Sequence, residues 1–210
     1  MNAYLIPTGP GEAEFSEKRS RFLGHVRCVG SEEEARAFIA QMKKKYYDAR
    51  HNCWCYIIKD GPERYSDDGE PQGSAGLPML EVFRKAGVNN VVCVVTRYFG
   101  GVLLGTGGLL RAYTKSAKDA LDDAGLSMVR PWAVAELRCP YSIAERLKLE
   151  LAAAGGAVED REYSADGRIK ALIPAEALAD LKDRITELTA GSVSLTQTGT
   201  ACRAAPVAAK

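Results

Sequence analysis

The run from Val91 to Arg111 constrains the fold of this chain more than any other stretch. It begins with the apolar residues 91–95, which are typical of a buried strand, and continues through one arginine and two aromatic residues. Five glycines then lead into a helical pattern. Because glycine lacks a Cβ atom, it reaches positive φ and lets the backbone approach a partner closely. A glycine-rich passage from a strand into a helix also presents N–H groups at the positive end of the helix, which favours an anion.

The glycines permit two interpretations, and both stay open. They can serve only tight turns and close packing of a helix on a sheet. Alternatively, the run is an anion-binding surface, which the arginines at its two ends favour. In that case we expect both guanidinium groups to be exposed and to converge with the free N–H groups. The candidate ligand-binding residues of the run are Arg97, Tyr98, Gly100, Gly101, Gly105, Thr106, Gly107, Gly108 and Arg111.

The aromatic pair in this run could stack on an unpaired base. Neighbouring residues on a strand point to opposite faces, so Tyr98 and Phe99 cannot both face one side. At most one of them therefore forms a stacking platform beside Arg97.

A second candidate group is acidic. Asp67, Asp68 and Glu70 cluster in a long polar loop, and carboxylates can bind Mg²⁺ or exchange protons. The same residues are also typical of an ordinary turn, which is the favoured interpretation. A ligand-binding role requires that this loop face the glycine-rich run.

Other catalytic or metal sites have weaker support. His51 could act as a general base with Asp68 orienting it, and His51, Cys53 and Cys55 would share one strand face, where core packing is favoured over metal binding. The six cysteines include no Cys-x-x-Cys pair, so we expect free thiols and no metal. Neither a P-loop nor a Gly-x-Ser-x-Gly elbow is present. We expect no cofactor and assign no catalytic residue.

Charge and hydropathy limit the partners. The 210 residues carry 28 Lys+Arg and 27 Asp+Glu, a formal net charge of +1. A protein that holds nucleic acid through many phosphates has a larger basic excess, so any RNA contact must be local, driven by shape, or weak. No apolar run approaches the ~20 residues that span a bilayer. The first residues lack the pattern of a signal peptide, so we expect a cytoplasmic location and no membrane partner.

The order of elements predicts an α+β protein of two domains. Strands are expected at 12–18, 22–29, 53–59 and 91–95, and helices from Ser31, from Pro78 to Gly87, and over 107–124. Arg130-Pro131-Trp132 marks the expected boundary. After it, the pattern becomes a ferredoxin-like βαββαβ arrangement with a last strand at 192–198. We predict domains at 1–130 and 131–200, followed by a frayed tail at 201–210.

Two motifs resemble those of a known family. The residues from Arg97 to Tyr113 read Arg-Tyr-Phe-Gly-Gly-x-x-Leu-Gly-x-Gly-Gly-Leu-x-Arg-Ala-Tyr, and a second motif spans Tyr65–Pro71, Gly73–Gly76 and Pro78. Both resemble the IMPACT family, in its bacterial YigZ branch, and the resemblance covers roughly residues 15–125. It implies that the first domain has a fold like domain 2 of ribosomal protein S-five.

The resemblance also implies a function. Relatives in eukaryotes are linked to translational control through protein contacts. We therefore expect a non-enzymatic, translation-associated regulator that binds ribosomal RNA or a ribosome-bound protein. The alternative is an enzyme or binder acting on a small phosphorylated ligand held by the glycine-rich loop.

Overall fold

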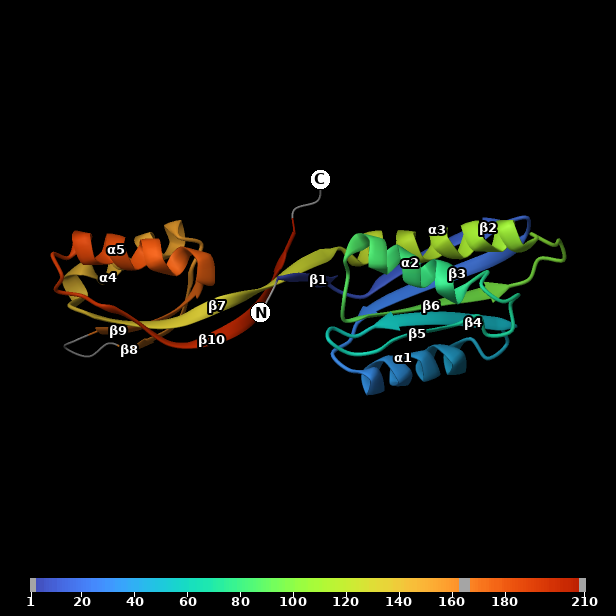
Figure 1. Cartoon of the computed structure of the whole chain (residues 1–210), viewed down its shortest axis with the longest axis horizontal. Helices are drawn as coiled ribbons and strands as arrows, with labels where there is room; N and C mark the ends of the chain where they lie inside the picture. The colour runs from blue at the N-terminus through green and yellow to red at the C-terminus, as the bar shows by residue number, and fades with distance from the viewer. Residues whose placement is uncertain (1–2, 163–166, 208–210) are drawn as a thin grey trace. The chain divides into compact units, whose positions relative to one another are not determined.

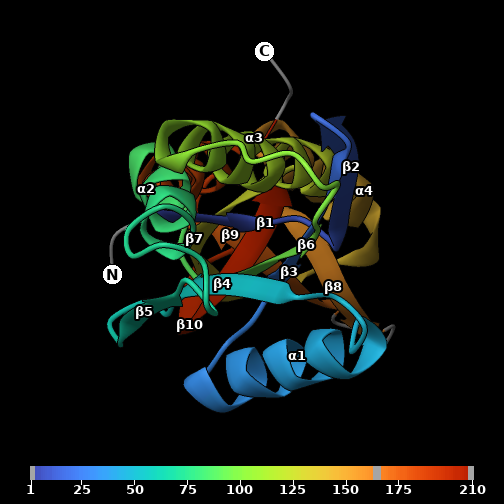
Figure 2. The ribbon, with the colours of Figure 1, turned by 90° about the vertical axis from the view of Figure 1, so that its right-hand side faces the viewer.

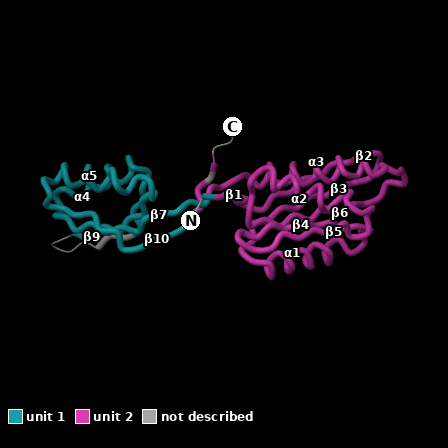
Figure 3. Tube along the Cα trace, viewed as in Figure 1, with its two compact units in different colours: residues 1–3, 129–203 teal, residues 4–128, 204–210 magenta. Residues whose placement is uncertain are grey.

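Residues 3–162 and 167–207 are described in the computed structural model. They form two compact units, coloured separately in Figure 3 and traced from end to end in Figure 1. Unit 2 comprises residues 4–128 and 204–210, and unit 1 comprises residues 1–3 and 129–203. The last residues of the expected tail, 208–210, lie outside the described residues.

Unit 2 is built on an antiparallel five-stranded sheet with β6 at its centre. The strand order is β2-β3-β6-β4-β5. In the register of this sheet, Arg97 on β6 pairs with Phe22 on β3 and with His51 on β4. The strands are β2 (Gly11–Glu17), β3 (Ser20–Cys28), β4 (His51–Ile57), β5 (Glu63–Ser66) and β6 (Val91–Tyr98).

Helices cover both faces of this sheet, as Figure 1 shows. The helices α2 (Gly76–Ala86) and α3 (Thr106–Ala124) pack on one face, and α1 (Glu32–Lys45) packs on the other. Since β6 is sandwiched between the two layers, every residue from 91 to 97 is buried. A continuous apolar run is therefore the pattern that this strand requires.

Two residues that the sequence places at helix ends have that role in the structure. Ser31 caps α1, because its Oγ accepts the N–H of Glu34 at 3.3 Å. Gly87 ends α2 in the left-handed region, at φ 66°.

Unit 1 has the expected ferredoxin-like arrangement. Its strands pair in the order β10-β7-β9-β8, and the helices α4 and α5 pack on one face through Leu147 and Ile185. The elements are β7 (Leu126–Cys139), α4 (Tyr141–Ala153), β8 (Ala157–Glu162), β9 (Gly167–Pro174), the short 3₁₀ helix η1 (Ala175–Ala177), α5 (Leu178–Leu188) and β10 (Leu195–Pro206).

Strand lengths differ from the sequence expectation. The strand β7 runs without a break through Arg130-Pro131-Trp132, where we expected a boundary. Proline is tolerated there because pairing with β9 starts one residue later, at Trp132. The strand β10 continues to Pro206 instead of ending at 198. The domain limits at 1–130 and 131–200 stay predictions.

Two short strands were not expected at all. They are β1 (Tyr4–Pro7), which pairs with β7, and β5 within the long polar loop. Each has four residues, which is too short for an alternating pattern to identify.

Candidate functional site

A cleft of about 360 Å³ opens in unit 2 beside the start of α3. The end of β6, the start of β4 and the acidic loop form its walls together with the glycine-rich run. The loop that carries Glu70 therefore faces the run, which was the condition for a shared site. The lining residues are Arg50, His51, Glu70, Pro71, Arg97, Phe99, Leu103, Leu104, Gly105, Thr106 and Leu109.

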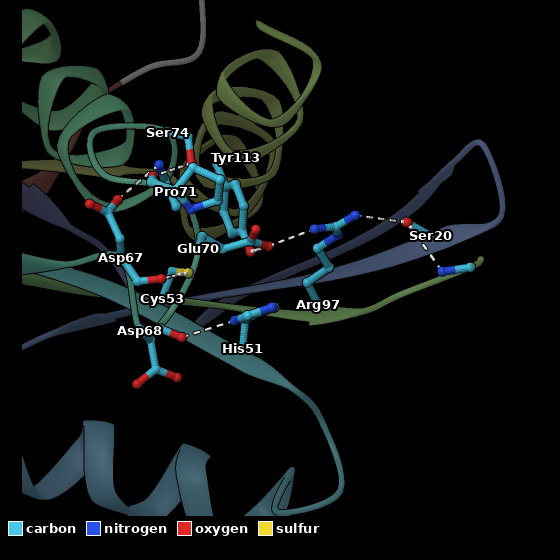
Figure 4. A network of polar contacts seen from close by, with 12 residues as sticks. Ser20, His51, Cys53, Asp67, Asp68, Glu70, Pro71, Ser74, Arg97 and Tyr113 are labelled. Carbon is cyan, nitrogen blue, oxygen red and sulfur yellow. Dashed lines mark hydrogen bonds and ion pairs between the residues drawn. The ribbon is translucent and has the colours of Figure 1, made fainter. Parts of the chain in front are cut away.

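Two residues that line the cleft form a buried ion pair, which Figure 4 shows. Arg97 Nη1 donates to Glu70 Oε1 at 2.7 Å, and Arg97 Nη2 donates to Ser20 Oγ at 3.3 Å. Arg97 and Glu70 are only 5% and 8% exposed. The expectation of an exposed guanidinium group is therefore wrong for Arg97. Strand alternation explains this burial, because Arg97 lies on the same face of β6 as Val95, the face on which α2 and α3 pack.

Tyr113 on α3 also binds Glu70. Its hydroxyl donates to Glu70 Oε1 at 2.8 Å. Burial raises the pKa of the Tyr113 phenol far above its usual value, and the neighbouring Cys53 and Glu70 raise it further. The phenol is therefore a permanently neutral donor, and it holds the carboxylate in place.

Two aromatic rings enclose the Arg97 guanidinium. Its Cζ lies 5.6 Å from the ring centroid of Phe22 and 5.4 Å from that of Phe99. Within the described structure, Nε of Arg97 is buried without a hydrogen-bond partner. Stacking on aromatic faces is a favourable environment for a guanidinium group.

Of the two aromatic residues after Arg97, Phe99 lines the cleft, and it is 43% exposed. Tyr98 is held elsewhere, because its hydroxyl donates to Asp48 Oδ1 at 2.8 Å and its ring lies beside Arg21. The alternation of the strand thus separates the two rings.

Asp67 is bound to the backbone of its own loop and of α2. It accepts N–H groups from Gly73, Ala75 and Gly76 at 2.8, 3.0 and 2.9 Å. These N–H groups lie at or just before the beginning of α2. Asp67 therefore supplies, from outside the helix, hydrogen bonds that an N-cap side chain would supply. This arrangement favours the turn interpretation for Asp67.

Asp68 also has partners of its own. Its carboxylate binds Lys43 Nζ at 2.6 Å and accepts the N–H of Asn52 at 2.7 Å. Only its backbone carbonyl oxygen meets His51 Nδ1, at 2.9 Å, so the carboxylate does not orient His51 as a catalytic pair would require. No group of three or more His, Cys, Asp or Glu side chains within the described ranges could hold a metal ion.

The fold accounts for four glycines of the run. A Cβ atom on Gly100 would lie 2.0 Å from the carbonyl carbon of Arg19. Gly101 and Gly105 have φ of 83° and 72°, which side chains rarely adopt. Gly108 is tight, because its Cβ would lie 3.0 Å from Leu104 Cβ.

Gly107 has no such explanation. A Cβ atom there would meet only Arg111 Nη1, at 3.7 Å, so the fold leaves room for a side chain. Its φ lies outside the left-handed region. Neither a steric clash nor the backbone conformation requires glycine at position 107. Close approach of a ligand to this turn would require it.

The start of α3 has no side-chain cap. Gly105 occupies the N-cap position, the first turn carries no acidic residue, and the first N–H to bond within the helix is that of Leu109. The N–H groups of residues 106–108 are therefore not satisfied by a capping side chain, and Thr106 places them beside the cleft.

A second groove, of about 250 Å³, lies on the other side of Leu104. It is lined by Phe15, Glu17, Lys18, Leu104, Gly108, Arg111, Ala112 and Lys115. Arg111 is exposed, as expected. Lys18, Arg19, Arg50 and Arg111 form no ion pair with any residue that the structure describes.

Phe99, Arg50, Lys18 and Arg19 were missing from the expected site. Lys18 and Arg19 come next to the run only because β3 pairs with β6, a contact between segments about 80 residues apart. No local pattern reports such a pairing. For Phe99 the signal existed, since alternation places it on the same side as Arg97.

The chain matches two family models. The Impact N-terminal domain matches residues 18–121, and a domain of unknown function (DUF1949) matches residues 137–192. The protein "IMPACT family member YvyE" of Bacillus subtilis is 35% identical over 193 residues, which cover 91% of this chain and 89% of the relative. "IMPACT family member YigZ" of Escherichia coli is 33% identical, with coverage of 93% and 98%.

A solved structure is similar over the same length. It is described as the crystal structure of a hypothetical protein, is 32% identical, and aligns with a TM-score of 0.60 over 95% of this chain and 98% of its own. Within the described part of the chain, no helix has the length and apolar character needed to cross a membrane.

Proposed function

We propose that this chain, which belongs to the IMPACT family, is a non-enzymatic, translation-associated regulator that binds ribosomal RNA or a ribosome-bound protein. Membership fits a translation-related regulatory role at the level of the family. The binding of ribosomal RNA is the form of that role that the charges of the candidate site favour.

One observation carries the proposal. Arg50 lines the cleft at the uncapped start of α3, Lys18 and Arg111 line the second groove, and none of the three is neutralised by an ion pair among the described residues. Phosphate oxygens are the ligands that guanidinium groups and helix N-termini both favour. Since the whole chain carries a net charge of only +1, this concentration of positive charge is local.

Co-sedimentation with purified ribosomal subunits tests the proposal. We expect the parent chain to pellet with a subunit at low salt and to be released as salt rises, because phosphate contacts depend on counterion release. The Arg50→Ala/Arg111→Ala variant should lose association. The matched control is Lys118→Ala/Arg146→Ala, which removes two exposed cations that line neither the cleft nor the second groove. If the first variant pellets as the parent does, the site does not bind the ribosome.

Gly107 and the cleft volume favour a second candidate, a small phosphorylated ligand. A cleft of about 360 Å³ is at the lower end of the range of ~300–1,000 Å³ that small-molecule sites occupy. Thermal unfolding with inorganic phosphate and nucleoside phosphates tests it. A saturable rise in melting temperature, absent in Arg50→Ala, would support this candidate.

A further inference from the structure

We propose that the nucleic acid bound at this site is single-stranded RNA, with an unpaired base stacked on Phe99 and phosphates held in the grooves on both sides of Leu104. This inference rests on the proposed function and names the form of RNA that the site takes. The cleft and the second groove are the two halves of the binding surface, which we call the RNA track.

The two grooves share one lining residue just before the beginning of α3. Leu104 lines both of them, Thr106 lines the first, and Gly108 and Arg111 line the second. Figure 2 views unit 2 from the side on which the start of α3 lies. Cations stand on both sides of Leu104, with Arg50 in the cleft and Lys18 in the second groove. A backbone that crosses Leu104 would therefore meet positive charge before and after it.

Phe99 offers a fixed face to a base. Its ring is held on one side by the Arg97 guanidinium, at 5.4 Å, and Arg97 is itself fixed by Glu70 and Ser20. The ring keeps 43% of its surface exposed. A contact that restricts the ring reduces the conformational entropy that is lost when a base stacks on it.

Two exposed apolar residues follow Phe99 in the same loop. Leu103 is 82% exposed and Val102 is 41% exposed, so the loop presents an apolar surface next to unpaired cations. Base faces are apolar and the RNA backbone is anionic, which matches this combination. In a duplex the base faces are stacked inside the helix and cannot reach Phe99. Single strands expose both groups together, and aromatic side chains with a positive groove are their usual site.

A protein partner is the competing occupant. An acidic segment with apolar side chains would match the same surface, and the test must separate it from RNA. The neighbouring carboxylates do not argue for a basic partner. Glu70 already pairs with Arg97, and Glu17 is the one carboxylate among the residues that line the second groove.

Fluorescence anisotropy on the full chain tests the inference. The probes are a labelled single-stranded RNA of about 12 nucleotides, within the lengths that such sites cover, and the blunt duplex of the same sequence. We expect the parent to bind the single strand at least about tenfold more tightly than the duplex. Phe99→Leu keeps an apolar side chain but removes the ring, and it should weaken single-strand binding about 5- to 150-fold.

Two more variants control for other effects. Phe99→Trp keeps the ring and should bind as the parent does, with its indole fluorescence quenched by the single strand. Tyr65→Leu removes a ring that is 46% exposed on β5, outside both grooves, and should change nothing. If Phe99→Leu does not fold, quenching of Phe99→Trp decides the question.

The outcomes separate this inference from the proposed function. Equal binding of duplex and single strand, parent-like binding by Phe99→Leu, or unquenched Phe99→Trp would overturn stacking while leaving ribosome binding intact. Co-sedimentation with ribosomes without binding to either RNA would assign the surface to a protein partner and overturn the inference. Absence of both RNA binding and co-sedimentation would overturn the proposed function itself.

Discussion

Replacement of Arg97 by alanine should destabilise unit 2 strongly. The side chain is 5% exposed and its partner Glu70 is 8% exposed, so the variant leaves a buried carboxylate to which, among the described side chains, only the Tyr113 hydroxyl donates. Removal of one partner of a buried pair typically costs about 3–5 kcal/mol. Folded domains are stable by only about 5–15 kcal/mol, so this loss is a large fraction of the total.

Urea unfolding measures this loss. The chain has tryptophans in both units, Trp54 and Trp132, so a Trp132→Phe background lets fluorescence report on unit 2 alone. With an m-value of about 2 kcal/mol/M, a cost of about 4 kcal/mol lowers the midpoint by about 2 M. Arg111→Ala is the control, because its side chain is exposed and its removal should change stability by no more than about 0.5 kcal/mol.

A double-mutant cycle sharpens the test. Glu70→Ala alone leaves the Arg97 charge buried, whereas the double variant removes both charges. The sum of the two single costs in free energy of unfolding should therefore exceed the cost of the double variant by a coupling of about 1–3 kcal/mol. A cost below about 1 kcal/mol for Arg97→Ala, or strictly additive costs, would refute the reasoning.

Three further predictions concern other parts of the fold. Gly107→Ala should be neutral or stabilise α3 by up to about 1 kcal/mol. Gly105→Ala should cost about 1–3 kcal/mol, because its φ of 72° and ψ of 164° belong to a region that is essentially confined to glycine; thermal melts compare the two variants. Burial lowers the pKa of His25 below the 6.5 of an unfolded histidine, partly offset by Glu12. The folded state thus binds fewer protons, so stability should be full above pH 6.5 and fall as the pH drops below it; a urea midpoint equal at about pH 7.5 and 5.5, or an unchanged profile in His25→Gln, would contradict this. Limited proteolysis should resolve fragments of about 130 and 75 residues if the domains divide near Pro131, and one resistant core spanning that position would count against the division.

The sequence predicts local structure well where a physical pattern is local. The apolar run of β6, the cap at Ser31 and the glycine at position 87 each act within a few residues, and each is found in the structure. Pairing between distant strands has no such signal. The burial of Arg97 depends on α3 covering one face of the sheet, and the position of Lys18 depends on β3 pairing with β6.

For the candidate site, too, the sequence predicts local features and misses those that depend on distant contacts. Glycines that need positive φ and the exposed Arg111 follow from the sequence. Asp67 and Asp68 looked like possible ligands, because a carboxylate in a loop can bind a metal ion or accept a backbone N–H group. Only the three-dimensional arrangement shows that Asp67 binds N–H groups at the start of α2 and that Asp68 binds Lys43.

The salt dependence of RNA binding tests the central claim most directly. Each phosphate of a single strand that binds a cation of the protein contributes about 0.7 to the slope of the logarithm of the binding constant against the logarithm of the salt concentration. The account predicts that Arg50→Ala/Arg111→Ala weakens binding and lowers this slope by about 1.4, while Lys118→Ala/Arg146→Ala leaves it unchanged. An Arg50→Ala/Arg111→Ala variant with the affinity and slope of the parent chain would contradict the claim that the start of α3 binds RNA phosphates.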